Sequence, residues 1–374
     1  MKVLLVVTGL PDATGPGRSA FNRVFVNELT NLGVEVTLVH ARSINPSREL
    51  VSKRLMDGIE CYTISAFVPP LPCIGGPIFI SRLFEQSFKR LDLAFDVVHA
   101  VGGGAAIAAS IAADFKGKPL ILQFIGDDVN TRLKNSLKDY RFLNAVFTST
   151  CLCFNSNKLL ETFRTLVPLT QKCEVVYRGV RPEEFKSIHA DAEEVRLLFL
   201  GGIPSGNEKG ALTLVKAIQC LDKADLPTRL NFVIGGPRSL TLVSRIKVRN
   251  PRLRTTFVGE IDRKSVIEEL ESSHIVLIPS LNEGVPNLLF EAMASGNMVI
   301  ASDVGGIPEV LAHGVSGILV KPGDHVMLAE SIMDAISDKQ KIRDFSESGR
   351  QIVEKFDYRN FSSAYIRIYK QISK

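Results

Sequence analysis

A strand, a polar turn, a helix and a second strand follow one another in the second half of the chain. His274 to Ile278 is an apolar run that is typical of a buried strand, and a polar turn comes after it. Pro286 has the fixed φ that suits the start of a helix, and Asn287 to Ser295 contains helix formers and no helix breaker. Met298 to Ala301 returns as a strand. This order of elements is typical of parallel α/β folds, so it restricts the chain to that class.

Two glutamates flank the start of the predicted helix. Glu283 lies in the turn before it, and Glu291 lies about one and a half turns inside it. The N-terminus of a helix presents unpaired backbone N–H groups and a partial positive charge, so it can hold a phosphate without a metal. Carboxylates on either side can accept hydrogen bonds from sugar hydroxyls. The pair alone also fits a simpler interpretation, in which Glu283 is solvated and Glu291 only favours the helix dipole.

The residues around both glutamates form a longer pattern, P-S-x-x-E-G-x-P-N-x-x-x-E-A-M-A-x-G, which D-V-G-G-x-P-E follows. This pattern closely resembles the E-x7-E signature of glycosyltransferase family 4, whose members are retaining enzymes with the GT-B fold. The resemblance implies an α/β protein of two Rossmann-like, doubly wound domains that face a cleft, with a C-terminal helix that crosses back to domain one. It also implies that a nucleotide sugar binds between the domains.

The same resemblance implies roles for particular residues. Glu291 would hold the ribose hydroxyls of the nucleotide, and Glu283 would face the donor sugar. Lys209 matches the lysine of the family's G-R-x…K-G phosphate clamp, whereas the arginine of that clamp corresponds to Gly202 here. An ammonium group is a good partner for a diphosphate, but half of the clamp's charge is missing. The other donor-binding residues on this basis are Gly259, Ile261, Gly284, Val285, Pro286, Asn287 and Leu288.

Length and linker composition indicate two domains. A chain of 374 residues is long enough for both, and a polar linker near Lys186 to Glu194 separates two α/β patterns. We therefore predict an N-terminal Rossmann-like, acceptor-side domain over residues 1–187 and a C-terminal Rossmann-like, nucleotide-sugar-binding domain over residues 188–355. Residues 356–374 resemble the family's terminal helix and are expected to pack on the N-terminal domain.

A predicted strand in the N-terminal half, Pro119 to Ile125, ends in Gly126-Asp127-Asp128. Carboxylates at the carboxyl end of a parallel strand lie where such folds bind ligands, so Asp128 is expected to orient the sugar or the acceptor. The alternative is that the aspartates cap a helix from Val129 to Leu143. The family often has a His here, in a pattern like H-G-x-D, and Ile125 replaces it. Because Ile cannot move a proton, catalysis is expected to rest on Glu283, Asp128 and the donor's own phosphate, unless the protein is a weak or inactive relative.

The first loop of the chain reads T-G-L-P-D-A-T-G-P-G-R-S. Gly15 and Gly17 let the backbone approach a ligand closely just before a helix begins, and the family resemblance places this loop at the border of the cleft. We therefore expect both glycines to contribute to donor binding, although an ordinary turn explains the loop equally well. The loop is not G-x-G-x-x-G, which disfavours a nicotinamide-dependent oxidoreductase.

The formal net charge of +5 comes from the N-terminal half. Residues 1–187 contain 22 Lys and Arg against 17 Asp and Glu, whereas residues 188–374 contain 23 of each. A basic half suggests an anionic partner such as a phosphorylated lipid or a membrane surface, although a slightly basic solvated surface is the simpler interpretation. Nucleic acid is disfavoured because no basic run is interleaved with aromatic residues. No apolar run approaches the ~20 residues that cross a bilayer, so we expect a cytoplasmic protein, with peripheral contact to the inner face of the membrane as an option.

These features together predict a retaining glycosyltransferase that moves a sugar from a nucleotide diphosphate sugar to a hydroxyl group of a glycan or lipid-linked acceptor. We expect a UDP-sugar, with a GDP-sugar as the alternative, and a role in surface polysaccharide or glycolipid biosynthesis. Neither a cofactor nor a metal is expected, because the helix dipole and Lys209 can offset the charge of the leaving diphosphate. Two alternatives within the same fold are a nucleotide-sugar-binding protein without turnover and a GT-B sugar epimerase.

Overall fold

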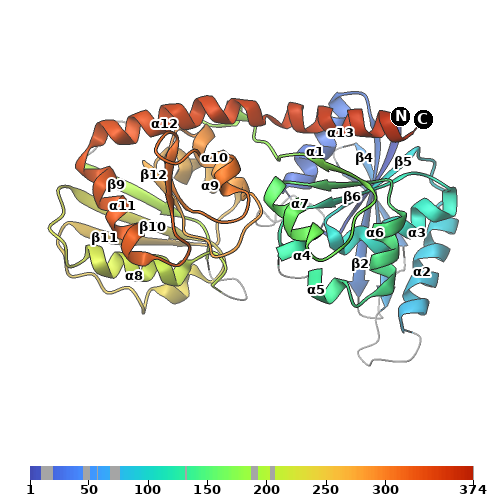
Figure 1. Ribbon diagram of the computed structural model, residues 1–374, viewed down its shortest axis with the longest axis horizontal. Helices are drawn as coiled ribbons and strands as arrows, with labels where there is room; N and C mark the ends of the chain where they lie inside the picture. Colours follow the sequence, from blue (N-terminus) through green and yellow to red (C-terminus); the bar gives the residue numbers. More distant parts are fainter. Residues whose placement is uncertain are drawn as a thin grey trace. The chain divides into compact units, whose positions relative to one another are not determined.

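The structure, a computed structural model, describes residues 1–9, 20–44, 51–56, 58–67, 76–130, 133–186, 193–202 and 207–373. The loop glycines Gly15 and Gly17 lie outside these residues. By its packing the chain divides into two compact units (Figure 1). The first contains Met1–Val176 together with Phe361–Lys374, and the second contains Tyr177–Asn360. The domain limits at 187/188 and 355/356 stay predictions.

The first unit is built on one eight-stranded sheet with the order β3-β4-β2-β1-β5-β6-β7-β8. Neighbouring strands are parallel, except that β3 and β4 are antiparallel. Every residue of β5, β6 and β7 is buried, so both faces of the sheet are covered there, as expected for continuous apolar strands. The strands are β1 Lys2–Val7, β2 Glu35–Ile44, β3 Val51–Met56, β4 Ile59–Phe67, β5 Val97–Val101, β6 Leu120–Phe124, β7 Cys151–Phe154 and β8 Lys172–Val175.

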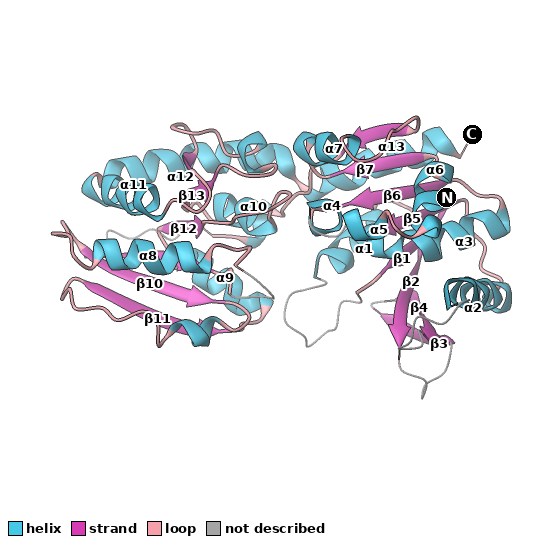
Figure 2. Cartoon of the chain, turned by 60° about the horizontal axis from the view of Figure 1, so that its bottom comes forward, coloured by secondary structure: helices cyan, strands magenta, loops and turns pink. Residues whose placement is uncertain are grey.

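Most of the strands of the first unit are separated along the chain by helices (Figure 2). These helices are α1 Ala20–Asn31, α2 Gly76–Leu91, the 3₁₀ helix η1 Gly103–Ala105, α3 Ala106–Lys116, α4 Asp127–Asn130, α5 Leu133–Ser136, α6 Tyr140–Thr148 and α7 Asn157–Arg164. The single helix from Val129 to Leu143, which the capping alternative assumes, is wrong. Asp139 starts a separate helix, because its carboxylate accepts from the Arg141 amide at 3.0 Å and caps α6.

The C-terminal helix α13 (Tyr358–Ile372) packs on the first unit through its aromatic side chains. The Phe361 ring lies 4.9 Å from that of Phe25 in α1, and the Tyr365 ring stacks 4.7 Å from the imidazole of His99 in β5. The hydroxyl of Tyr369 lies 2.7 Å from Nδ1 of the same imidazole. The terminal helix therefore completes the hydrophobic core of the first unit.

The second unit contains a six-stranded, wholly parallel sheet with the order β11-β10-β9-β12-β13-β14. Its strands are β9 Glu194–Phe199, β10 Arg229–Gly235, β11 Leu253–Gly259, β12 Ile275–Ile278, β13 Met298–Ser302 and β14 Gly317–Val320. Its helices are η2 Pro182–Glu184, α8 Ala211–Leu221, η3 Ser239–Leu242, α9 Arg263–Glu271, α10 Asn287–Ala294, η4 Ile307–Glu309, α11 His325–Ser337, α12 Lys339–Val353 and η5 Glu354–Phe356. The strand, helix and strand predicted between residues 274 and 301 are β12, α10 and β13.

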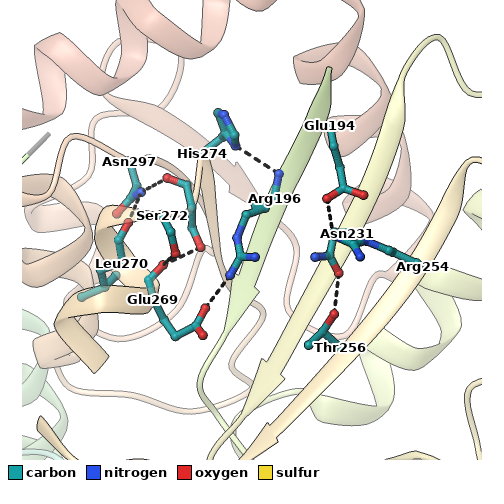
Figure 3. A network of polar contacts seen from close by, with 11 residues as sticks. Glu194, Arg196, Asn231, Arg254, Thr256, Glu269, Leu270, Ser272, His274 and Asn297 are labelled. Carbon is teal, nitrogen blue, oxygen red and sulfur yellow. Dashed lines mark hydrogen bonds and ion pairs between the residues drawn. The ribbon is translucent and has the colours of Figure 1, made fainter. Parts of the chain in front are cut away.

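A polar network ties the amino-terminal parts of these strands together (Figure 3). The buried Asn231 accepts from the Thr256 hydroxyl at 3.0 Å between β10 and β11. Arg196 of β9 pairs with Glu269 of α9 at 2.7 Å, and its amide donates to His274 Nδ1 at 3.1 Å. None of the predicted site residues belongs to this network, so we assign it to the register and packing of the sheet.

Candidate active site

The predicted donor-site residues of the second unit lie at the carboxyl ends of its parallel strands. The loop of residues 279–286 follows β12, Lys209 lies after β9, and Gly259 is the last residue of β11. In open parallel sheets this edge is where ligands bind. Residues 286–288 are partly exposed, whereas residues 284 and 285 are buried. Among residues 284–288 the accessible part is therefore the start of α10.

Lys209 and Glu283 form an ion pair at this edge. The Lys209 Nζ atom is 2.5 Å from Oε1 of Glu283, and the Ser280 hydroxyl donates to the same oxygen at 3.0 Å. The Glu283 side chain is 9% exposed, while that of Lys209 is 39% exposed. The carboxylate is therefore held inside the loop, and the ammonium group stays accessible to a ligand.

Two glycines let neighbouring loops meet around Glu283. Gly210 has a φ of +72°, and a Cβ atom there would lie 1.7 Å from the Pro279 carbonyl oxygen. Gly305 has a φ of +59°, and a Cβ atom there would lie 2.1 Å from the Glu283 carbonyl oxygen. Only glycine allows both the backbone conformation and the close approach. The K-G and D-V-G-G parts of the sequence pattern thus fix the backbone that carries Glu283.

The N-terminus of α10 is favourable for an anion. Pro286 is the residue before the helix, with φ −71° and ψ 138°, and no side chain caps this end. Within the described residues the amides of Asn287 and Leu288 make no hydrogen bond, as usual for a first helical turn. Nη1 of Arg178 donates to Oδ1 of Asn287 at 3.2 Å. The end of the helix therefore combines two amide donors with a nearby cation.

Glu291 forms a second ion pair, with Arg263. Oε1 of Glu291 accepts from Arg263 Nη1 at 2.6 Å, and Arg263 Nη2 lies 3.3 Å from Oε2 of Glu184. Burial opposes the charge on Arg263, but the carboxylates of Glu291 and Glu184 outweigh it, so the pKa of Arg263 is raised. Burial raises the pKa of Tyr358 beside this cluster to about 12. Arg263 is therefore a permanent cation next to Glu291, and Tyr358 keeps its proton at neutral pH.

Gly202 occupies the position that corresponds to the family's clamp arginine. Its φ is +57°, and a Cβ atom would lie 2.3 Å from the Pro237 carbonyl oxygen. Its amide donates to a carbonyl oxygen of β10 at 3.1 Å. The backbone here therefore excludes any side chain, and its N–H group is already engaged. Gly259 and the partly exposed Ile261 lie at the same edge, and contact of these three residues with a donor stays a prediction.

Asp128, in the first unit, directs its carboxylate at backbone amides. It accepts from the amides of Ile125 at 3.0 Å, Gly126 at 2.9 Å and Gly103 at 2.9 Å. It thus ties the carboxyl end of β6 to the turn after β5. Asp128 lies inside α4 and not before it, so the interpretation that it caps a long following helix is wrong. Its role toward a sugar or an acceptor stays a prediction.

Sequence reasoning did not identify Ser280 or Arg263 as contributors to this site. Ser280 is part of the P-S-x-x-E pattern and lies three residues before Glu283, a spacing at which a turn brings a hydroxyl to a carboxylate. The contact of Ser280 with Glu283 could therefore have been predicted from the sequence pattern. Arg263 lies 28 residues from Glu291, and nothing in the linear pattern relates the two.

The described residues offer no group of three or more His, Cys, Asp or Glu side chains that could hold a metal ion. Among the helices of the described ranges, none is long and apolar enough to cross a membrane.

Comparison with known proteins shows which families the chain matches. The family described as glycosyl transferases group 1 matches residues 180–352, and the family described as Glycosyltransferase Family 4 matches residues 19–184. A Bacillus subtilis protein, TuaC, named for teichuronic acid biosynthesis, is 27% identical over 89% of this chain and 88% of its own length. The N-acetyl-alpha-D-glucosaminyl L-malate synthase of Bacillus anthracis is 33% identical over 40% of this chain and 39% of its own length.

Solved structures share the fold at lower identity. The sucrose-phosphate synthase of Thermosynechococcus elongatus superposes with a TM-score of 0.75 at 20% identity, over 99% of both chains. Anabaena HepE, solved in complex with UDP and glucose, gives a TM-score of 0.74 at 17% identity, over 99% of this chain and 100% of its own. From the two family matches and this shared architecture, the chain belongs to glycosyltransferase family 4 and has the GT-B fold.

Proposed function

We propose that the protein binds the diphosphate of a nucleotide sugar at the start of α10 and transfers the sugar to a hydroxyl acceptor with retention of the anomeric configuration. The observation that carries this proposal is the ion pair of Lys209 and Glu283, at 2.5 Å, beside the helix N-terminus. It brings a cation suited to a diphosphate and a carboxylate suited to a sugar hydroxyl into one place.

In the proposed complex the diphosphate accepts from the amides of Asn287 and Leu288 and from the ammonium group of Lys209. The ribose hydroxyls donate to Glu291, and Ile261 borders the base. The other proposed donor-binding residues are Gly15, Gly17, Gly202, Gly259, Gly284, Val285 and Pro286. On this proposal residues 188–355 bind the donor, residues 1–187 bind the acceptor, and residues 356–374 are the crossing helix that packs on the N-terminal domain.

The proposed transfer breaks the bond between the anomeric carbon and the phosphate oxygen, and the nucleoside diphosphate leaves with the electron pair. The helix N-terminus and Lys209 stabilise the developing negative charge, so the step needs neither a metal nor a cofactor. The acceptor oxygen forms the new bond on the same face of the sugar, and its proton passes to the leaving phosphate. Glu283 orients the donor sugar, and Asp128 orients the sugar or acceptor through the turn that it holds.

The names of relatives direct the choice of substrates. HepE was solved with UDP and glucose, so UDP-sugars are the first donors to test and GDP-sugars the second. TuaC is named for teichuronic acid biosynthesis, so a glycan or lipid-linked acceptor of surface polysaccharide or glycolipid synthesis is the proposed setting. We also propose a cytoplasmic location, with peripheral membrane contact through the basic residues 1–187.

The test begins with thermal shifts in the presence of UDP, GDP and ADP, because a ligand at 100 times its Kd stabilises a protein by about 2.7 kcal/mol. The nucleotide with the largest shift selects the nucleotide sugars for turnover assays. These assays compare the parent, Glu283→Gln and Asp128→Asn, with and without a metal chelator. Both variants are expected to lose most of their turnover while they still bind nucleotide, and the chelator is expected to have no effect.

Three results would contradict the proposal in different ways. Donor binding without hydrolysis or transfer over a broad set of acceptors would indicate a binding protein. Conversion of the nucleotide sugar without release of nucleoside diphosphate would indicate an epimerase. Turnover that survives both substitutions would keep the enzyme but remove Glu283 and Asp128 from its chemistry.

A further inference from the structure

The guanidinium group of Arg263 connects three segments of the second unit. Arg263 is the first residue of α9, and its Nη1 donates to Oε1 of Glu291 in α10 at 2.6 Å. Its Nη2 donates to Oε2 of Glu184 at 3.3 Å, and its guanidinium carbon lies 5.4 Å from the centroid of the Phe185 ring. Asp262 fixes the start of α9, because its carboxylate accepts from an amide of the first turn at 2.8 Å. The position of the guanidinium group is thus restrained from several sides.

The orientation of the Glu291 carboxylate depends on this guanidinium group. The Glu291 side chain is 18% exposed, and within the described residues Arg263 is the one hydrogen-bond donor to its carboxylate. Oε1 is therefore engaged, while Oε2 can accept hydrogen bonds from a ligand. The donors of a guanidinium group have a planar, fixed geometry, so they restrict the direction of a carboxylate more than an ammonium group does.

The ion pair of Arg263 and Glu291 also neutralises a negative charge at this edge of the sheet. A nucleoside diphosphate is an anion, and an uncompensated carboxylate near its binding site repels it. Glu283 is paired with Lys209 and Glu291 is paired with Arg263, so each carboxylate of the E-x7-E pattern has a cation beside it. Removal of Arg263 would leave a mostly buried negative charge at Glu291.

We propose that Arg263 is a positioning residue for donor binding, which orients the Glu291 carboxylate toward the ribose hydroxyls and neutralises its charge. This inference rests on the proposed function, in which Glu291 accepts from the ribose. Arg263 does not itself contact the donor. Glu184 acts one step further away, because it holds the second Nη of Arg263.

The test measures nucleotide binding to the full-length protein by titration calorimetry, with UDP, GDP or ADP chosen by the strongest binding to the parent. Arg263→Ala is expected to weaken binding about tenfold or more, as the loss of a hydrogen bond between charged groups does. Arg263→Lys is expected to recover part of this loss, because an ammonium group restores the charge and one hydrogen bond. The loss in Arg263→Ala is expected to shrink at high salt, since ions screen the uncompensated carboxylate.

Lys264→Ala is the matched control. Lys264 is the next residue of α9, its side chain is 86% exposed, and its Nζ lies 3.6 Å from Glu268 on the surface. Loss of an exposed pair is expected to leave nucleotide binding within about twofold of the parent. Glu184→Gln keeps Arg263 but removes one of its partners, and we expect a smaller loss than in Arg263→Ala. This variant tests the proposal even if Arg263→Ala does not fold.

A double substitution separates action through Glu291 from an independent effect. If Arg263 acts through Glu291, Arg263→Ala causes no further loss of binding in a Glu291→Ala background. Two results would overturn the positioning role of Arg263, provided that Glu291→Ala itself binds nucleotide weakly. One is a loss of binding that is the same in both backgrounds. The other is an Arg263→Ala variant that binds nucleotide like Lys264→Ala. If Glu291→Ala binds like the parent, the proposed donor site itself is wrong. In turnover assays Arg263→Ala is expected to raise the donor KM with little change in kcat.

Discussion

The buried His99 gives the first unit a stability that depends on pH. Its imidazole is completely buried between β5 and α13, where Nδ1 contacts the Tyr369 hydroxyl at 2.7 Å and the ring stacks on Tyr365 at 4.7 Å. Burial lowers the pKa of His99 to about 3, and the side chain of Gln123 opposes this more weakly. The folded protein therefore keeps His99 neutral at pH values where the unfolded chain protonates it.

The size of the effect follows from proton linkage. Between the folded pKa of about 3 and the usual value of 6.5, the unfolded state binds more protons, so the free energy of unfolding rises with pH. The contribution of the neutral, buried His99 to the free energy of unfolding is complete above pH 6.5, and it falls by about 1.4 kcal/mol for each pH unit below that value. At pH 4.5 the loss amounts to ~2.7 kcal/mol, because this pH lies about two units below the unfolded pKa. Since pH 4.5 is also well above 3, the result hardly depends on the folded pKa.

The assay compares urea unfolding of the parent and of His99→Gln at pH 7.5 and pH 4.5, followed by circular dichroism. Hydrogen exchange of the β5 amides assigns the transition to the first unit. The parent is expected to lose about 2.7 kcal/mol more than the variant between the two pH values, because Gln takes up no proton. Tyr369→Phe removes the hydroxyl but keeps His99 buried, so it should retain the pH dependence. Equal losses in the parent and His99→Gln would refute burial of a neutral His99 as the cause.

Three further predictions concern the site. Gly305→Ala should lower the thermal midpoint and weaken nucleotide binding, because its Cβ would lie 2.1 Å from the Glu283 carbonyl oxygen. Its control is Gly314→Ala, because Gly314 has a φ of +74° but open space around it, so this variant measures the cost of the backbone conformation alone. Lys209→Ala should weaken UDP binding roughly ten- to hundredfold and uridine binding less, as measured by calorimetry. Gly202→Arg, which introduces the family's clamp residue, should lower the thermal midpoint without tighter nucleotide binding, and tighter binding would show that the backbone adapts.

The parts of the fold that the sequence predicted have strong local signals. The unit β12, α10 and β13 combines two apolar strands with a helix that has a proline before it, and each boundary lies within about one residue of the expectation. The positions of Glu283 and Lys209 at the carboxyl edge follow from the order of strands and loops in a parallel sheet. Their contact was not predicted, because the sequence pattern contains Gly210 and Gly305 but does not show which loops approach each other at these glycines.

Other features lie beyond local patterns. β3 is an edge strand whose middle residues, Ser52 to Leu55, are exposed, so it lacks the apolar run that marks the central strands. The segment after Asp128 has the composition of one helix, but Asp139 starts a new one by capping α6. The partner of Glu291 was missed because Arg263 lies on a different helix, and the pairing depends on how α9 and α10 pack. Tertiary contacts decide each of these cases.

The pairing of Lys209 with Glu283 changes how a Lys209 variant must be interpreted. Lys209→Ala removes the proposed ligand of the diphosphate, but it also takes the cation from a Glu283 side chain that is 9% exposed. Loss of a partner from a mostly buried pair is itself destabilising, so weaker binding in Lys209→Ala mixes two effects. Glu283→Gln removes the negative charge and keeps the size of the side chain, so the double variant Lys209→Ala with Glu283→Gln lacks the uncompensated charge. If the double variant binds UDP as weakly as Lys209→Ala, the lysine contributes directly to diphosphate binding. If it recovers the parent affinity, the main role of Lys209 is to neutralise Glu283, and the helix N-terminus binds the diphosphate.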